Sequence, residues 1–508
     1  MKAIRLIPTL LLPLFLIACA APAKRITIIH HNDFHSWNVP WGAVDQKGDS
    51  LYIQGAAGLE GLAKAVRDTS AASLWLFAGD EFTGTAPSTL TEGASQIQIA
   101  GRLSSEVVVL GNHEFDYGLN RAEAYRDSIG KVVLGGANLR YPDGRLFSRE
   151  YLDTTIGGVP LRIIGLEPPD LHELTSEGAT GKLLIFEPDS VVRALLPSKE
   201  RLAVVLSHMG VSEDSALAVR VPELDLIVGG HTHATLRRPW LVGVTQAWID
   251  SLPPASGKRL PGTLIVQAGA RGIYLGVLGL TVKDGDIIAA TGKLLRNDGK
   301  IAPPDAELAA YAKEIDGQAT AGLEEVVATL AEPMTRMGEE SVLGRWEADI
   351  FREATGADIG IQNPGGLRRD LVAGNLTLRD IFEVNPFGNT LATFEVTGEE
   401  LLYMLNLLAV GPREYLQVSG IIATLDMKTG EVSDVMVGGI PLDPARRYKV
   451  TTNSYVFGHF ETYFNVPAID RKVVMGERLD RDIIAEVARK AGEIKAPKDE
   501  RLKYVGGE

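Results

Sequence analysis

The sequence predicts an α/β protein of two domains joined by a helical linker. Its 508 residues exceed what a single hydrophobic core usually supports. Apolar runs of strand length recur through the first part of the chain, and a segment with helical spacing then precedes a second α/β unit. We expect a first domain over residues 24–300, a linker over 301–325 and a second domain over 326–508.

Five apolar runs in the first domain have the continuous character of strands that are buried on both faces of a parallel sheet. A side chain that can bind metal follows each run almost at once. Because the carboxyl ends of neighbouring parallel strands meet at one edge of a sheet, these side chains are expected to form one site. The runs lie at 26–29, 74–78, 107–110, 202–206 and 226–228.

The linker begins with Ala302-Pro303-Pro304 and carries apolar residues at helical spacing, including Leu308 and Ile315. In the second unit, glycine and proline mark turns at 363–366 and 385–389. These features favour an interdomain helix followed by a further α/β domain.

The first 19 residues have the features of a signal peptide. Basic residues precede an apolar stretch at 6–18 that is too short to span a bilayer as a stable helix. Leu16-Ile17-Ala18-Cys19 resembles a bacterial lipobox, and Cys19 is the only cysteine. We expect an exported lipoprotein, periplasm-facing or on the cell surface, whose membrane contact is only through acylated Cys19. A plain secreted protein is the alternative.

The net charge of −14 argues against a nucleic-acid polymer as the partner, because such a protein would repel the phosphate backbone. A small phosphate ester can still bind where metal ions and a few arginines supply local positive charge. The charge therefore excludes one class of partner and leaves the small-molecule class open.

The ligand candidates are carboxylate, imidazole and amide groups without a thiolate, which suits a pair of divalent ions such as Mn, Zn, Fe, Co or Mg. Asp33 and His35 lie two residues apart, so in an extended segment they share a face and can grip one ion. Asp80 can bridge two cations about 3.5 to 4 Å apart. The remaining candidates are Asn112, His208, His231 and His233.

Any one of these residues alone is as readily explained as a turn or a surface group. The segments that follow the five buried-type strands hold five of the nine histidines, namely His35, His113, His208, His231 and His233. This joint placement predicts a two-metal site.

Eight motifs stand out along the two domains: His31-Asn32-Asp33-Phe34-His35, Gly79-Asp80, Gly111-Asn112-His113-Glu114-Phe115-Asp116, Ser207-His208-Met209-Gly210, Gly229-Gly230-His231-Thr232-His233, Asn363-Pro364-Gly365-Gly366-Leu367-Arg368, Asn385-Pro386-Phe387-Gly388-Asn389-Thr390 and Leu416-Gln417-Val418-Ser419-Gly420. By these motifs the chain resembles the calcineurin-like metallophosphoesterases, and within them the bacterial 5'-nucleotidase family. The resemblance implies an N-terminal β-sandwich flanked by helices and a C-terminal 5'-nucleotidase-type α/β domain. It also implies that Asp33, His35, Asp80 and His233 hold one metal, and that Asp80, Asn112, His208 and His231 hold the other.

His113 directly follows a ligand candidate, and Asp116 lies three residues further on. Charge grows on the phosphoryl and leaving oxygens during phosphate-ester hydrolysis, so a cationic imidazole beside the metals would stabilise it. The family uses such a His–Asp pair, and both positions match. The alternative for Asp116 is to cap a helix that begins near Tyr117, and both roles could coexist.

The expected nucleophile is a water or hydroxide on the metals that attacks phosphorus in line, without a covalent enzyme intermediate. The chain has no nucleophile elbow with a paired base that would favour a covalent route.

By the resemblance, the second domain binds the nucleoside and rotates on the linker to deliver the substrate. Asn363 and Arg368 match the family's glycine turn followed by Arg, whose fork would clamp phosphate oxygens. Tyr415 and Tyr455 match two aromatics that sandwich a base. Phe387 is a further candidate contact, although an aromatic in a Pro-Phe-Gly turn can simply pack into the core.

Two features depart from the family pattern. After the second aromatic, the family usually has a Gly-Gly-Asp-Gly-aromatic run, whereas this chain has Gly458-His459-Phe460-Glu461-Thr462-Tyr463. An Arg expected early in the second domain is represented only loosely, by Arg336 or Arg345. The base and ribose contacts and one phosphate anchor are therefore left open.

The favoured function is an exported dimetal phosphohydrolase, a 5'-nucleotidase that converts nucleoside 5'-monophosphates into nucleoside and phosphate. One alternative is a phosphodiesterase or nucleotide-sugar hydrolase that acts on cyclic nucleotides or UDP-sugars. The other is a nucleotide-binding lipoprotein without turnover.

Overall fold

The computed structural model describes residues 22–44, 50–175, 178–243, 248–249, 257–410, 415–464 and 472–506. The predicted signal peptide and Cys19 lie outside these residues. Among the described helices, none combines the length and apolar character that crossing a membrane requires.

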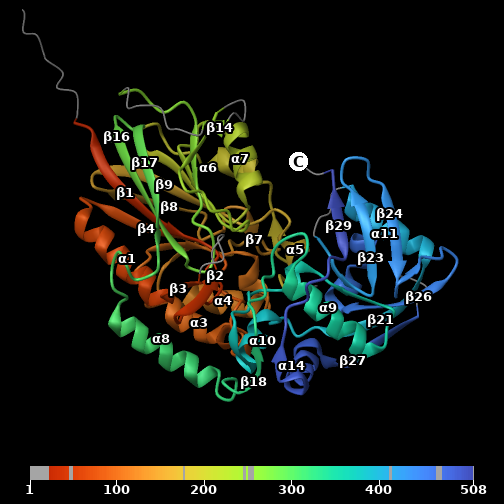
Figure 1. Cartoon of the computed structure of the whole chain (residues 1–508). Coiled ribbons are helices and arrows are strands. Elements are labelled where there is room, and N and C mark those ends of the chain that lie inside the picture. The colour runs from red at the N-terminus through yellow and green to blue at the C-terminus, as the bar shows by residue number, and fades with distance from the viewer. Residues whose placement is uncertain are drawn as a thin grey trace, which may run out of the picture.

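Two sheets stack face to face in the amino-terminal half (Figure 1). Strands β1, β4, β5 and β6 run parallel in the first sheet, and β9, β11, β12 and β15 run parallel in the second. In spatial order the first sheet contains β17 (Asp286–Arg296), β16 (Tyr274–Lys283), β1 (Lys24–His31), β4 (Ser73–Ala78), β5 (Val107–Val109) and β6 (Val132–Leu134). The second contains β14 (Trp248–Ile249), β13 (Trp240–Val242), β15 (Thr263–Val266), β12 (Leu226–Val228), β11 (Leu202–Ser207), β9 (Val159–Leu166) and β8 (Tyr151–Ile156).

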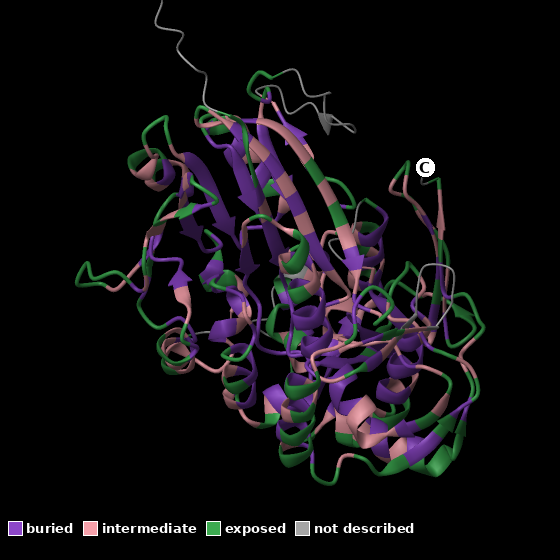
Figure 2. Cartoon of the chain, turned by 90° about the vertical axis from the view of Figure 1, so that its left-hand side faces the viewer, coloured by how far each residue is buried: buried purple, intermediate pink, exposed green. Residues whose placement is uncertain are grey.

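The core of this half lies between the two sheets and under the helices that cover them. Ile28 and Leu76 from the first sheet belong to the same buried cluster as Val204 and Leu226 from the second. Helix α1 (Gly55–Thr69) covers the outer face of the first sheet, and α7 (Val211–Arg220) packs against the second. Figure 2 shows the inner strands mostly in purple, whereas edge strands and outer helices carry pink and green stretches. The predicted β-sandwich flanked by helices is confirmed.

The five predicted apolar runs form inner strands of the two sheets, where both faces of each strand are covered. Burial on both faces explains why these runs are continuously apolar. Shorter elements connect them: β2 (Trp41–Val44), β3 (Ser50–Ile53), α2 (Ala86–Leu90), α3 (Ala94–Ala100), the 3-10 helix η1 (Asn112–Phe115), α4 (Leu119–Ser128), β7 (Leu139–Arg140), α5 (Leu171–Leu174), β10 (Leu184–Ile185) and α6 (Pro188–Leu195).

Helix α8 (Ala306–Ala319) lies in the expected linker and contacts both halves. The Asp305 carboxylate caps it by accepting a hydrogen bond from the Leu308 amide at 2.8 Å. Its apolar face packs into the amino-terminal core beside α1. At its other end, Arg379 of α10 (Leu378–Val384) donates two hydrogen bonds to Asp316, at 2.6 and 2.7 Å.

The carboxyl-terminal half is a second α/β unit, as predicted. Its main sheet is mixed and contains, in order, β22 (Gln417–Ser419), β19 (Ile359–Gln362), β26 (Arg447–Asn453), β21 (Thr390–Thr397) and β27 (Val473–Leu479). Two smaller sheets contain β20 (Gly374–Thr377), β18 (Val326–Leu330) and β28 (Glu493–Ile494), and β25 (Ile440–Pro441), β24 (Val432–Val437), β23 (Ile421–Asp426) and β29 (Leu502–Val505). The helical elements are α9 (Val342–Thr355), η2 (Pro364–Gly366), α10, α11 (Gly398–Ala409), α12 (Ser454–Gly458), α13 (Phe460–Phe464) and α14 (Asp480–Ala491).

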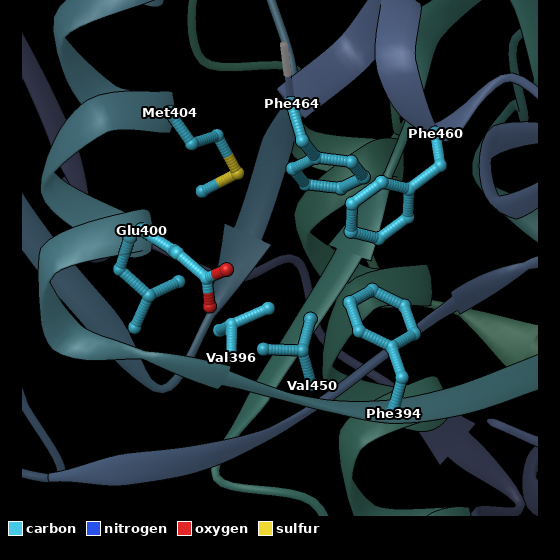
Figure 3. Close-up of a pocket in the computed structure, with 8 residues that line it drawn as sticks. Phe394, Val396, Glu400, Met404, Val450, Phe460 and Phe464 are labelled. Carbon is cyan, nitrogen blue, oxygen red and sulfur yellow. The ribbon is translucent and has the colours of Figure 1, made fainter. Parts of the chain in front are cut away.

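A small apolar cavity lies in the core of this half (Figure 3). Phe394 packs edge-on against Phe460 at a centroid distance of 5.2 Å, and Phe464 lies 4.6 Å from Phe460. The one charged residue in the lining, Glu400, accepts a hydrogen bond from the Thr397 amide and caps α11. The cavity is therefore part of the packed interior.

Candidate metal centre

The predicted ligands follow the carboxyl ends of adjacent parallel strands. Strand β1 leads to Asp33 and His35, and β4 leads directly to Asp80 through Gly79. Strand β5 leads to Asn112, and on the second sheet β11 leads to His208. His231 and His233 follow β12. The edge of the sandwich thus brings residues from almost the whole amino-terminal half to one place.

The first cluster contains Asp33, His35, Asp80 and His233, whose ligand atoms all lie within 4.8 Å of one another. The Nε2 atoms of His35 and His233 are 3.0 Å apart. His233 Nε2 lies 3.4 Å from an Asp33 oxygen, and His35 Nε2 lies 3.8 Å from an Asp80 oxygen. The two rings and two carboxylates therefore face a common centre.

The second cluster contains Asp80, His208 and His231, again with ligand atoms within 4.8 Å of one another. His208 Nε2 lies 3.1 Å from Asp80 Oδ2. The Asn112 amide oxygen lies 3.1 Å from His231 Nδ1, which brings the predicted amide ligand to the same cluster. Asp80 belongs to both clusters, which is the position that a bridging carboxylate requires.

The tautomers of two rings fit metal binding. His35 Nδ1 lies 2.9 Å from the Thr83 carbonyl and His208 Nδ1 lies 2.6 Å from the Ala78 carbonyl, so each Nδ1 carries the hydrogen and donates it. In the neutral ring, Nε2 then presents its lone pair to the cluster. Oxygen and nitrogen donors without sulfur suit Mn, Zn or Fe.

The backbone at the ligand positions is unusual. Five of the candidate ligands have φ in the left-handed region: Asp33 (50°), His35 (52°), Asp80 (61°), His231 (73°) and His233 (56°). Non-glycine residues rarely adopt this conformation, and each such residue costs about 1 kcal/mol or more. The fold therefore holds these side chains in their direction against a local backbone preference.

Glu114 holds the loops that carry Asp80 and Asn112. Its carboxylate is fully buried and accepts hydrogen bonds from the backbone amides of Gly111, Asp80, Glu81 and Phe82, at 2.5 to 3.1 Å. Only glycine fits at 111, because a Cβ there would lie 2.2 Å from an Asp80 oxygen.

The ionisation of the clusters follows from burial and mutual charge. Burial raises the pKa of Asp33 to about 7. Burial also acts to raise the pKa of Asp80, but His208, His113 and His35 outweigh it and hold that pKa well below its usual range. Burial disfavours the charged ring of His208, but Asp80 and Asp33 outweigh it and raise its pKa to about 10. A divalent ion takes a neutral imidazole, so binding here is coupled to loss of that proton.

His113 and Asp116 form the predicted pair, with His113 Nδ1 2.7 Å from Asp116 Oδ2. Burial acts to lower the pKa of His113, but Asp116 and Asp80 outweigh burial and raise it. Helix α4 starts at Leu119 with Gly118 as its cap residue, so Asp116 does not cap it. The His113 ring lies edge-on to His35 at 5.1 Å, beside the first cluster.

Arg368 of the carboxyl-terminal half lies close enough to the clusters to act on them electrostatically. Its positive charge lowers the pKa values of His35 and His233, after burial as the main cause. Arg336 lies near Arg368. Burial, and after it the positive charge of Arg368, lowers the pKa of Arg336. Arg345 instead pairs with Glu340 at 3.1 Å. Of the two loosely matching arginines, Arg336 is thus the one beside Arg368.

The remaining predicted substrate residues are spread over the carboxyl-terminal half. Asn363 is buried, and its side-chain oxygen accepts a hydrogen bond from Asn453 at 2.9 Å. Tyr415 packs edge-on against Tyr504 at 5.1 Å, and Tyr455, half exposed, lies against His459 at 4.3 Å. The two tyrosines thus pack against different neighbouring rings, and the base sandwich stays a prediction.

Phe387 is exposed and does not pack into the core. The Arg368 guanidinium lies 5.5 Å from its ring centroid, which places the phenyl ring next to the predicted phosphate ligand.

Sequence reasoning missed two arginines that the fold brings close to the site. Arg271 hydrogen-bonds through its amide to the Asp33 carbonyl at 2.7 Å, and its guanidinium lies 5.8 Å from the Trp37 ring. Arg369, from the other half, lies 5.6 Å from the same ring. These residues depend on loops that meet only in three dimensions, and no spacing in the sequence signals them.

Comparison with known proteins matches each half of the chain to a different family model. A calcineurin-like phosphoesterase family model matches residues 26–235, and a 5'-nucleotidase C-terminal domain model matches residues 326–468. The 5'-nucleotidase of Vibrio vulnificus (strain CMCP6) is 26% identical over 476 residues, covering 85% of this chain and 84% of that one. An apyrase of Tabanus yao is 24% identical and covers 94% of each chain. The crystal structure of a 5'-nucleotidase precursor from Thermus thermophilus has a TM-score of 0.81 at 26% identity, with 95% of this chain and 100% of that chain covered.

Proposed function

Because the chain belongs to the 5'-nucleotidase family of calcineurin-like metallophosphoesterases and is a metal-dependent phosphoric ester hydrolase, we propose that it hydrolyses nucleoside 5'-monophosphates to nucleoside and phosphate. The observation that carries the proposal is the sharing of Asp80 between two ligand clusters, with His113 beside one of them. A two-metal centre with an adjacent imidazole is suited to phosphoryl transfer to water.

In this proposal, Asp33, His35, Asp80 and His233 hold one divalent ion, and Asp80, Asn112, His208 and His231 hold the other. Two divalent ions, when bound, make an attacking water more acidic and neutralise charge on the phosphoryl oxygens.

The protein's own groups then act on the leaving side and on the phosphoryl oxygens. Asp116 keeps the His113 ring protonated and oriented, so that the other ring nitrogen can donate a proton to the leaving 5'-oxygen as the P–O bond breaks. Arg368 and Arg336 approach from the carboxyl-terminal half and supply donors for phosphoryl oxygens. Tyr415, Tyr455 and Phe387 are the candidates for contact with the base or ribose.

We propose further that the protein is exported and anchored through acylated Cys19, as the lipobox-like segment indicates. Metabolic labelling with a fatty acid, compared with a Cys19→Ala variant, tests this. Labelling of both forms would contradict the assignment.

The proposed reaction is tested by phosphate release from AMP with added Mn²⁺, alongside a cyclic nucleotide, a UDP-sugar and an aryl phosphate. Turnover of AMP above the two diesters supports the 5'-nucleotidase. Preference for a diester would move the assignment to the phosphodiesterase or nucleotide-sugar hydrolase. Tight nucleotide binding without hydrolysis under any divalent ion would favour a binding protein.

A further inference from the structure

Thr83 occupies a strained position between the metal clusters and the His113–Asp116 pair. It lies three residues after Asp80 in the loop that follows β4, and its side chain is buried. Its φ is +53°, in the left-handed region. For a β-branched residue this conformation is a true outlier, and such outliers persist where the surrounding structure requires them.

The backbone of Thr83 contacts a metal-ligand candidate. Its carbonyl accepts the hydrogen bond from His35 Nδ1 at 2.9 Å, and this bond sets the tautomer that turns Nε2 toward the first cluster. The Thr83 amide lies 3.3 Å from the Ser88 hydroxyl, which helps to hold the loop.

The side chain of Thr83 contacts the catalytic pair. Its hydroxyl donates a hydrogen bond to Asp116 Oδ2 at 2.6 Å, and the same oxygen accepts from His113 Nδ1 at 2.7 Å. The Tyr117 hydroxyl lies 3.4 Å from the Thr83 oxygen. One carboxylate oxygen thus accepts from two donors, and their directions together fix where the carboxylate stands.

Without the second donor, this carboxylate is free to turn. The Asp116 side chain is about one-fifth exposed, so solvent can take the place of His113 as its partner. The hydroxyl of Thr83 opposes that rotation, and the backbone of the same residue fixes His35.

We propose that Thr83 is a positioning residue for hydrolysis. It holds Asp116, and through Asp116 also His113, in a fixed position beside the metal-ligand cluster. The inference rests on the proposed function, in which His113 serves the leaving oxygen. Its effect should therefore be confined to the step that needs the imidazole, and should depend on the leaving group.

The test compares Thr83→Val, which keeps the shape and removes the hydroxyl, with Thr83→Ser, which keeps the hydroxyl. Thr85→Val is the matched control, because Thr85 is buried in the same loop but its hydroxyl donates to the Ser36 carbonyl at 3.0 Å. We expect kcat for AMP to fall about tenfold to a hundredfold in Thr83→Val, with KM and metal content retained. For p-nitrophenyl phosphate, whose leaving group needs no proton, the loss should be about threefold or less. Thr83→Ser should restore most of the AMP activity.

A double variant separates positioning from general damage. In a His113→Ala background, Thr83→Val should cost about twofold or less in kcat for AMP, because the group it positions is gone. Equal losses on both substrates, loss of metal, or full additivity with His113→Ala would overturn the inference. Should Thr83→Val fail to fold, Thr83→Ala is measured in the same way.

Failure of the proposed function has a different signature. A wild-type protein that hydrolyses none of the four phosphate esters with added divalent metal would contradict that function. An active wild type that loses AMP activity in His113→Ala but keeps it in Thr83→Val would overturn only the role of Thr83.

Discussion

The amino-terminal and carboxyl-terminal halves present their candidate functional residues in opposite ways. In the amino-terminal half, five of the seven predicted metal ligands are buried and the other two are half-buried. Five of the seven have left-handed backbone, and Glu114 holds the loops of Asp80 and Asn112 through four amides. In the carboxyl-terminal half, Asn363 is buried, but the candidate aromatic contacts Tyr455 and Phe387 are 50% and 44% exposed, with ordinary backbone.

This difference is consistent with catalysis in the amino-terminal half and substrate selection in the carboxyl-terminal half. A group that must hold two cations at a fixed spacing needs a rigid surround, whereas groups that meet different bases can remain at the surface. The comparison predicts that changes in the first half abolish turnover, and that changes in the second half alter substrate choice.

The largest effect should follow Asp80→Asn. Asp80 contributes to both clusters, so its loss should release both ions and lower kcat on every phosphate ester on the order of a thousandfold. Metal analysis of the purified variant and phosphate release from AMP measure this. Asp143→Asn, which changes an exposed carboxylate paired with Arg145, is the control. Retention of one full equivalent of metal in Asp80→Asn would show that the carboxylate is not shared.

His113→Ala should be the next largest change. We expect kcat for AMP to fall about a hundredfold while metal content stays at the wild-type value, because in the proposed function the ring lies beside the first cluster and assists the leaving oxygen without binding metal. Steady-state kinetics with AMP and metal analysis of the same purified variant test this prediction. Loss of metal together with activity would place His113 among the ligands instead.

Tyr415→Ala should act on selection alone. We expect KM for AMP to rise about tenfold, through loss of the proposed aromatic contact with the base, with hydrolysis of a small aryl phosphate largely intact. Tyr403→Ala, at an exposed tyrosine of α11, serves as the control. Equal loss on both substrates would break the proposed division between the halves.

Glu347→Gln should change the pH dependence of stability with the smallest effect on turnover. Glu347 is buried in the carboxyl-terminal half, accepts hydrogen bonds from Asn385 and Gln362, and burial raises its pKa from 4.5 to about 8. Between those values the folded state keeps a proton that the unfolded chain has lost. Its contribution is therefore complete below pH 4.5 and is lost as the pH rises toward 8, by up to about 1.4 kcal/mol per pH unit.

Denaturant unfolding across this pH window tests the prediction. The free energy of unfolding of the wild type should fall relative to Glu347→Gln as the pH rises. Glu353→Gln, at an exposed position of the same helix, should follow the wild type. Parallel curves for wild type and Glu347→Gln would show that Glu347 is ionised in both states.

Much of the fold could be predicted because double burial leaves a direct mark on the sequence. The run at 226–228 matches β12, and the capped, periodic segment after Asp305 forms α8. The ligand clusters follow from the same logic, since strand ends converge.

What could not be predicted depends on contacts across loops. The left-handed conformation of Asp80 and the packing of Tyr415 on Tyr504 of β29 arise from tertiary structure that no local pattern encodes. The only sequence signal at Thr83 is weak: it is a β-branched residue directly before Gly84 in the segment that follows Asp80. This signal can be interpreted only from the structure, in which the Thr83 hydroxyl donates a hydrogen bond to Asp116.

Trp37 can serve as an intrinsic fluorescence probe of this enzyme. Its indole lies 5.8 Å from the Arg271 guanidinium of one half and 5.6 Å from the Arg369 guanidinium of the other, so a rotation of the halves would change the cationic surroundings of that ring. The difference in emission between the wild type and a Trp37→Phe variant reports on Trp37 together with Trp41, whose ring centroid lies 4.3 Å away. The rotation that the family resemblance implies could then be timed in solution without attaching a dye.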